Sequence, residues 1–111
     1  MILLWYPKCS TCRRVKEHLE NKNIKFSLRD IVLDNPTKEE LLKWCNEENI
    51  KEFFNTSGIL YRELDLKNKL SKMTYLEKID LLKTNGKLVK RPILLTEKEV
   101  LVGPKKIESK F

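Results

Sequence analysis

The sequence predicts an α/β fold in which a βαβ unit and a ββα unit flank a helical segment at about residues 37–85. Short apolar runs lie near both ends of the chain, each beside a proline. Two Thr-x-x-Glu sequences, which are typical of helix starts, lie in the middle. Repeats and low-complexity segments are absent, and 111 residues suit a single domain, residues 1–111, with a modest core.

The first 30 residues predict a β–α–β unit. The apolar run Ile2–Tyr6 predicts a short buried strand. Over residues 10–22, Val15 and Leu19 lie four residues apart among charged neighbours, which predicts a half-exposed amphipathic helix. Residues 25–30 alternate apolar and polar side chains and predict a second strand.

The middle of the chain predicts several helices. Thr37 with Glu40, and Thr74 with Glu77, match the capping box that opens a helix. Asn85-Gly86 is expected to stop the second of these helices, which carries Leu76, Ile79 and Leu82. Between the two helices we expect a helical turn, a loop and a short helix, at residues 50–54, 55–58 and 59–66.

The last 20 or so residues predict the ββα unit. Ile93–Leu95 follows a proline and predicts a strand, and Val100–Val102 predicts its returning partner after a turn at Glu97-Lys98. Gly103-Pro104 then opens a final helix, since proline is well suited to a first helical position.

Composition narrows the class of protein. Hydrophobic residues make up 41% and charged residues 35%, which is typical of a globular chain. No apolar run approaches the roughly 20 residues of a membrane span, and the N-terminus lacks the features of a signal peptide. We therefore expect a cytoplasmic protein that does not bind membranes. In that reducing setting, three cysteines predict redox or metal chemistry in place of a disulfide framework.

The formal net charge of +7 has two interpretations. Basic residues are scattered among glutamates, which favours a solvated basic surface over a site for an acidic partner. Arginine blocks with interleaved aromatic residues are absent, so we expect no direct contact with nucleic acid.

A Cys-x-x-Cys pair between the first strand and the first helix is the main chemical motif. Cys9 would lie at a helix N-terminus, where unpaired N–H groups and the helix dipole favour thiolate over thiol. Lys8, Arg13 and Arg14 would add positive charge nearby. The thiolate is the nucleophile, so Cys9 is predicted to be a reactive thiol with Cys12 as its partner.

Other residues of chemical interest have simpler interpretations. Cys45 lies on an apolar helix face and is expected to be a core cysteine. His18, the only histidine, is expected to be a solvated helix residue, and we predict neither a metal site nor a catalytic Cys–His pair. Trp5 and Tyr6 border the cysteine motif, and strand packing is favoured over a substrate platform.

A Cys-x-x-Cys pair at the first strand–helix junction of a βαβ unit is typical of the thioredoxin-like fold. Several further motifs strengthen this interpretation: Tyr6–Arg13, Asn35–Thr37, Asn55–Gly58, Tyr61–Leu64 and Lys90–Ile93. With these motifs the chain resembles the arsenate reductase (ArsC)/Spx family over essentially its whole length. It looks closest to the small ArsC-like branch that carries Cys-x-x-Cys.

The resemblance implies a thioredoxin-like fold with a helical insertion and specific residue roles. Cys9 matches the catalytic cysteine of the arsenate reductases, and Arg91 matches one of three arginines around the oxyanion. Pro92 would be the cis-proline of the fold and would bring Arg91 beside Cys9. The other two arginine positions fall on Asn55 and Gly103, which weakens the expectation of arsenate reduction.

Arsenate reductases of this type usually have no cysteine at the position of Cys12. Here Cys12 would act as the resolving thiol and complete a dithiol–disulfide cycle. We therefore predict a thiol–disulfide oxidoreductase of the ArsC-like type that acts on a small thiol or disulfide substrate. It would bind no cofactor, and glutathione or a protein of the glutaredoxin or thioredoxin kind would regenerate it. Asn55, Thr56 and Ser57 could donate hydrogen bonds to the substrate, although a plain turn explains them equally well.

Two alternatives stay open. Spx-like redox regulators, which bind RNA polymerase without reading DNA, also carry the cysteine pair and the Arg-Pro element. Spx proteins usually extend further than Phe111 at the C-terminus, which favours the oxidoreductase. A catalytically silent binding module would keep the fold alone, since fold does not decide function. We expect a monomer in each case.

Overall fold

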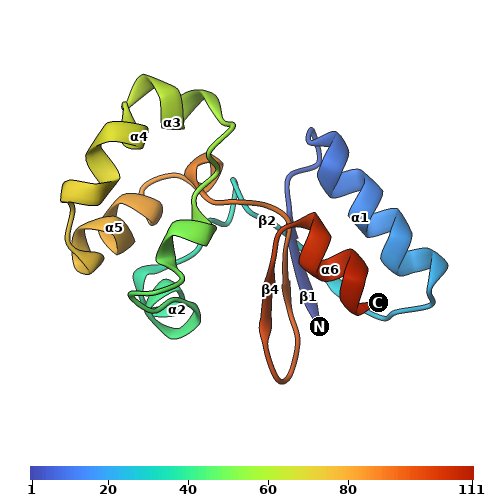
Figure 1. Cartoon of the computed structure of the whole chain (residues 1–111). Helices are drawn as coiled ribbons and strands as arrows, with labels where there is room; N and C mark the ends of the chain where they lie inside the picture. Colours follow the sequence, from blue (N-terminus) through green and yellow to red (C-terminus); the bar gives the residue numbers. More distant parts are fainter. The chain divides into compact units, whose positions relative to one another are not determined.

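The computed structural model describes all 111 residues, which divide into two compact units. Unit 1 contains residues Met1–Ile31 and Arg91–Phe111, and unit 2 contains residues Val32–Lys90 (Figure 1). Unit 1 is thus assembled from the two ends of the chain, and unit 2 is the helical segment inserted between them. That the 111 residues act as one domain stays a prediction.

A four-stranded mixed sheet forms the centre of unit 1. Its strands are β1 (Ile2–Trp5), β2 (Ser27–Asp30), β3 (Ile93–Leu95) and β4 (Val100–Val102), in the order β2-β1-β3-β4. β1 pairs with β2 in parallel, whereas β1–β3 and β3–β4 are antiparallel. This arrangement confirms the predicted α/β class, with a βαβ half and a ββα half that share one thioredoxin-like sheet.

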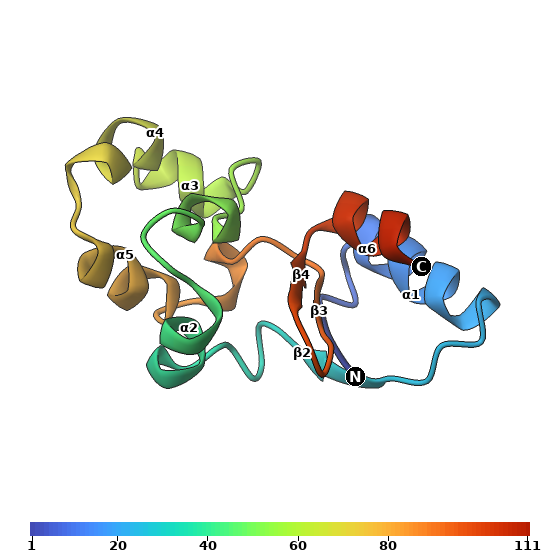
Figure 2. The same cartoon turned by 60° about the horizontal axis from the view of Figure 1, so that its bottom comes forward.

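Two helices cover one face of this sheet. α1 (Ser10–Asn21) and α6 (Pro104–Lys110) lie side by side in both ribbon views (Figures 1 and 2). Arg14 of α1 and Glu108 of α6 form an ion pair of 2.9 Å. The core between helices and sheet contains six buried side chains: Leu3, Val15, Leu19, Leu94, Leu101 and Ile107.

The second strand differs from its prediction. It begins at Ser27, two residues later than the alternating pattern suggested, and its Leu28 side chain is 45% exposed. β2 is the edge of the sheet, so a side chain there lacks a strand neighbour on one side. The alternation therefore identified the strand correctly but placed its start two residues too early.

Unit 2 is helical, as predicted. Both capping boxes are present: Thr37 accepts from the N–H of Glu40 at 3.1 Å, and Thr74 accepts from the N–H of Glu77 at 3.2 Å. The segments are α2 (Lys38–Trp44), η1 (Ile50–Phe53), α3 (Ile59–Glu63), α4 (Leu66–Lys69), η2 (Leu70–Lys72), α5 (Tyr75–Leu82) and η3 (Gly86–Leu88), where η marks a 3₁₀ helix.

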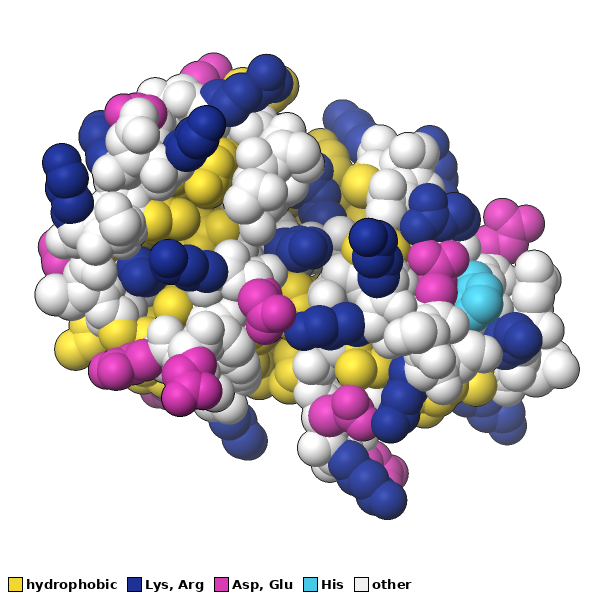
Figure 3. Space-filling view, in the orientation of Figure 1, with side chains coloured by type: hydrophobic (Ala, Val, Ile, Leu, Met, Phe, Trp, Pro, Cys, Tyr) yellow, Lys and Arg dark blue, Asp and Glu magenta, His cyan; other side chains and the backbone are white.

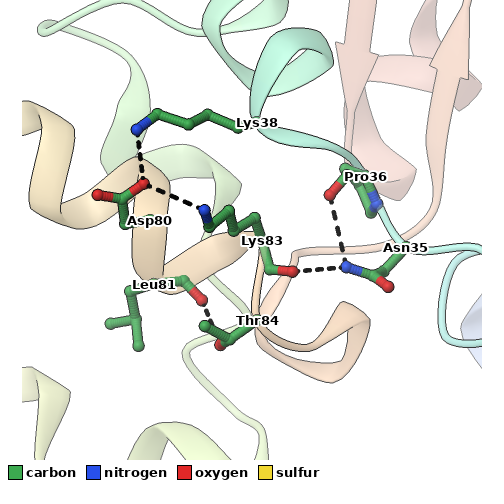
Figure 4. A network of polar contacts seen from close by, with 7 residues as sticks. All are labelled: Asn35, Pro36, Lys38, Asp80, Leu81, Lys83 and Thr84. Carbon is green, nitrogen blue, oxygen red and sulfur yellow. Dashed lines mark hydrogen bonds and ion pairs between the residues drawn. The ribbon is translucent and has the colours of Figure 1, made fainter.

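Polar contacts tie the start of unit 2 to α5 (Figure 4). The Asn35 side chain donates to the backbone carbonyl of Lys83 at 2.7 Å, and Lys38 lies 2.9 Å from the Asp80 carboxylate. Exposed ion pairs contribute little free energy, so the hydrogen bond to the backbone is the firmer of the two links.

α5 carries the three predicted apolar residues, of which Ile79 and Leu82 are buried and Leu76 is 54% exposed. The end of this helix corrects the sequence prediction. α5 ends at Leu82, and Asn85 caps the additional helix η3 by accepting from the N–H of Lys87 at 2.9 Å. A capping asparagine and a helix-stopping asparagine have the same sequence signature, which explains the difference.

The surface of the molecule is rich in charge. Lysine and arginine side chains are distributed over the face drawn in Figure 3, with carboxylates between some of them. This distribution fits the scattered pattern seen in the sequence. None of the helices is long and apolar enough to cross a membrane.

Candidate active site

Cys9 lies at the junction of β1 and α1. Its N–H donates to the carbonyl of Tyr6 at 2.9 Å, and its own carbonyl accepts from the N–H of Arg13 at 3.1 Å. Cys9 is therefore the N-cap residue of α1. The first turn of α1 contains no acidic residue, so the dipole of this 12-residue helix acts on the sulfur without a competing carboxylate.

Arg91 reaches Cys9 from the other end of the chain. The peptide bond between Arg91 and Pro92 is cis, as the resemblance implied. The guanidinium of Arg91 makes a hydrogen bond with the Cys9 side chain. Unit 1 thus brings together Cys9, Cys12, Arg91 and Pro92, and their roles in catalysis stay predictions.

The pKa of Cys9 is lowered by its neighbours. Partial burial on its own raises this pKa. Hydrogen bonds from the backbone and the side chain of Cys12, a hydrogen bond from Arg91 and the positive charge of Arg91 outweigh it and bring the pKa below its ordinary value of 9.0. Cys9 is also half-buried, so its sulfur can meet a reactant.

Cys12 has the opposite character. It is fully buried in the first turn of α1. Burial raises the pKa of Cys12 to about 12; the neighbouring Cys9 acts in the same direction, while a backbone hydrogen bond with Tyr6 and the charge of Arg91 oppose it. One site therefore holds a thiol that ionises easily beside one that keeps its proton.

The cations next to the motif act differently from the sequence prediction. Arg13 donates to the carbonyl of Pro7 at 2.8 Å, and Arg14 is paired with Glu108. The positive side chain that lowers the pKa of Cys9 is Arg91. Arg13 and Arg14, which are near Cys9 in sequence, are engaged by Pro7 and Glu108, while a cation distant in sequence acts on the sulfur.

Tyr6 has a contact that sequence reasoning missed. Cζ of Arg91 lies 5.0 Å from the centroid of the Tyr6 ring, which is a cation–π geometry. Trp5, by contrast, packs against the helix–sheet core, as predicted for a strand residue. A predicted pairing of β1 with β3 could have found the Tyr6 contact, because its register, continued past the strand ends, places Tyr6 opposite Arg91.

The predicted substrate-contact loop belongs to unit 2. Its hydrogen bonds are local: the side chain of Asn55 donates to the carbonyl of Lys87 at 3.3 Å and accepts from the Ser57 hydroxyl at 3.3 Å. A Cβ at Gly58 would lie 2.7 Å from Nδ2 of Asn55, so a larger residue at this position would displace the Asn55 amide. No hydrogen bond of Thr56 contributes to the turn. The turn interpretation of this loop therefore has direct support, and a role in substrate binding stays a prediction.

Gly103 occupies the second position where the family's arginine was expected. Its φ of 91° and ψ of 161° lie in a region that is almost exclusive to glycine. Its N–H donates to the carbonyl of Pro92 at 2.9 Å. The backbone here is incompatible with an unstrained arginine, which gives a physical reason for the missing residue.

Neither His18 nor Cys45 is among the groups that shift the pKa of Cys9. His18 is half-buried, with Nε2 shielded from solvent and without a hydrogen-bond partner, so the prediction of a solvated histidine was wrong. Cys45 is buried, as expected of a core cysteine, and burial raises its pKa to about 12. No three His, Cys, Asp or Glu side chains come together as metal ligands.

Comparison with known proteins agrees with the fold and the motif. The model of the ArsC family matches residues 4–109. A crystal structure of an ArsC family related protein from Bacteroides fragilis has 52% identity and a TM-score of 0.90, covering 97% of this chain and 94% of that chain. Protein YusI of Bacillus subtilis (strain 168) is 44% identical over 89% of this chain and 86% of its own length.

A third relative has a regulatory name. Regulatory protein MgsR of the same strain is 34% identical over 88% of this chain and 78% of its own length. Members of the matched family include arsenate reductases and Spx regulators. The family match, the mixed sheet and the cysteine motif agree, and the chain belongs to the ArsC family.

Proposed function

We propose that this chain is a thiol–disulfide oxidoreductase in which Cys9 is the nucleophile and Cys12 is the resolving thiol. The observation that carries the proposal is the contrast between the two cysteines. Cys9 is half-exposed with a lowered pKa, whereas Cys12 is fully buried with a raised pKa. That contrast assigns the first attack to Cys9, because the reacting species is an accessible thiolate.

The reaction is an exchange of sulfur partners. The Cys9 thiolate attacks one sulfur of a substrate disulfide, forms a mixed disulfide and releases the other sulfur as a thiolate. Cys9 is then neutral, so it no longer disfavours the ionised form of Cys12. Cys12 loses its proton, attacks the Cys9 sulfur and releases the second substrate thiolate. The substrate gains two electrons, and the protein is left with a Cys9–Cys12 disulfide.

Two external thiol equivalents would then restore the dithiol. We propose glutathione or a glutaredoxin-type or thioredoxin-type protein for this step, in keeping with the thiol chemistry of the family. Pro92 and the turn residues Asn55, Thr56 and Ser57 are proposed substrate contacts.

Disulfides are favoured over arsenate as the substrate. An oxyanion needs several fixed donors, and arginine supplies five in a planar fork. Arg91 is the one arginine retained, since the other two family positions hold Asn55 and Gly103. The Asn55 amide is engaged within its own turn, and the backbone of Gly103 excludes an unstrained arginine. A single arginine is better suited to stabilising a thiolate than to enclosing an oxyanion.

A turnover assay on two substrates tests this function. Wild type would be measured with a glutathione mixed disulfide and with arsenate, in the presence of glutathione and glutaredoxin. We expect turnover on the disulfide, none with Cys9→Ser, and a trapped mixed disulfide with Cys12→Ser, visible by mass spectrometry. Cys45→Ser is the matched control, since Cys45 lies in unit 2, and it should retain wild-type turnover. Turnover on arsenate alone, or on neither substrate, would contradict the proposal.

A redox-sensing regulator is the second candidate, favoured by the 34% identity to Regulatory protein MgsR. The same cysteine pair would then switch between dithiol and disulfide without turnover, and the partner would be RNA polymerase. A pull-down with purified RNA polymerase, using the reduced and the oxidised chain, discriminates the two. Redox-dependent retention of polymerase together with no disulfide turnover would replace the oxidoreductase with the regulator.

A further inference from the structure

The position of the Arg91 side chain needs an explanation. An arginine side chain loses rotamer entropy when it is held in one conformation. A neutral thiol is a weak hydrogen-bond acceptor, so the bond from Arg91 to Cys9 is strong only while the thiol is ionised. A contact that does not depend on the ionisation of Cys9 would hold the guanidinium in both states.

The sheet supplies that contact through strand register. β1 and β3 are antiparallel, and Leu4 of β1 pairs with Ile93 of β3. Tyr6 and Arg91 lie just beyond the ends of β1 and β3, and continuing the register of this ladder by two residues places them opposite each other. The paired strands therefore bring the two residues near each other.

The geometry of this pair is that of a cation–π contact. Cζ of Arg91 is 5.0 Å from the centroid of the Tyr6 ring, inside the limit of about 6 Å for a significant interaction. Both side chains are half-buried, which reduces solvent screening of the attraction. The guanidinium therefore contacts both an aromatic ring and the Cys9 sulfur.

We propose that the ring of Tyr6 is a positioning group that holds the Arg91 guanidinium beside Cys9 whether or not the thiol is ionised. The inference deepens the proposed function, on which it rests in one respect: Cys9 is taken to be the reactive thiol. Tyr6 acts through Arg91 and touches no reactant in this scheme, so it is not itself a catalytic residue.

The contribution of the ring can be separated from that of the Tyr6 backbone. The carbonyl of Tyr6 accepts from the N–H of Cys9, and a backbone hydrogen bond links Tyr6 with Cys12. Both contacts persist with any side chain at position 6. Tyr6→Leu removes the ring alone, and Tyr6→Phe keeps the ring and removes only the hydroxyl.

The test measures the pKa of Cys9 from the thiolate absorbance at 240 nm, in a Cys45→Ser background that lowers the signal from other thiols. We expect Tyr6→Leu to raise this pKa by about 0.5–1 unit, and Tyr6→Phe to keep it within about 0.2 unit of wild type. Arg91→Met should raise it at least as far as Tyr6→Leu. The double variant should match Arg91→Met alone, because the ring acts only through the guanidinium.

Several results would overturn the proposal: a wild-type pKa in Tyr6→Leu, additive shifts in the double variant, or an unchanged pKa in Arg91→Met. If Tyr6→Leu does not fold, nuclear Overhauser contacts between the Tyr6 ring and the Arg91 side chain of the wild-type protein decide it, and their absence refutes it. These readouts need no substrate. If the protein shows no disulfide turnover but the pKa of Cys9 responds to the variants as expected, the proposed function is rejected and this inference stands.

Discussion

Restoring an arginine at Gly103 is predicted to destabilise the protein without creating an arsenate reductase. The residue has φ 91° and ψ 161°, and holding a residue with a side chain in this region costs about 1–3 kcal/mol. Unfolding entropy of roughly 2.1 cal/mol/K per residue gives about 0.23 kcal/mol/K for a chain of this length. The strain therefore corresponds to a melting temperature lower by about 4–13 °C.

Thermal unfolding by circular dichroism would compare wild type with three variants. Gly103→Ala isolates the cost of the backbone conformation, and its melting temperature should fall as far as that of Gly103→Arg. Lys105→Arg, on the exposed surface of the neighbouring helix, should stay within about 0.5 kcal/mol of wild type. A Gly103→Arg variant that has the wild-type melting temperature, or that gains arsenate turnover, would refute the reasoning.

Three further outcomes follow from caps, burial and ionisation. Thr74→Ala should lower the free energy of unfolding in urea by about 1 kcal/mol through loss of its capping box, whereas the exposed Ser71→Ala should change it by less than about 0.5 kcal/mol. The pKa values of Cys12 and Cys45 are raised to about 12 in the folded state, against an ordinary value of 9.0. Their contribution to stability is thus complete below pH 9 and is lost as the pH rises toward 12, so urea midpoints of the reduced protein should fall over that range and fall less in Cys45→Ala. Iodoacetamide at about pH 7 should label Cys9 before the other two cysteines, as peptide mass mapping would report; equal labelling of the three would contradict the lowered pKa of Cys9.

Local signals in the sequence predicted local structure well. The capping boxes at Thr37 and Thr74 formed as expected, because all their atoms lie within four consecutive residues. The strand at residues 93–95 and its return at 100–102 were equally clear, since only a short turn separates them. Burial was harder to predict: Leu28 and Leu76 are apolar yet exposed, because an edge strand and a helix surface each leave one side without neighbours.

The candidate site was predictable only in part for the same reason. Cys9 and Cys12 could be identified because their spacing and the helix start are local features. The source of the positive charge at Cys9 could not be identified from local sequence. Arg13 and Arg14 bind other groups, and Arg91 is brought near Cys9 by the pairing of β3 with β1. The family resemblance suggested that Arg91 lies beside Cys9. The contact between the Tyr6 ring and Arg91 was not predictable in this way, because it depends on the register of β1 and β3, and a shift of one residue would remove it.

Burial of Cys12 has a consequence for how the protein leaves its oxidised state. A reductant can approach only the half-exposed Cys9 sulfur, so the thiol expelled from the disulfide must be Cys12. A sulfur that holds its proton tightly is a poor leaving group, and burial is the largest cause of the raised pKa of Cys12. Recycling would then be the slow half of the cycle, and a reductant that donates a proton to the departing Cys12 would have the advantage.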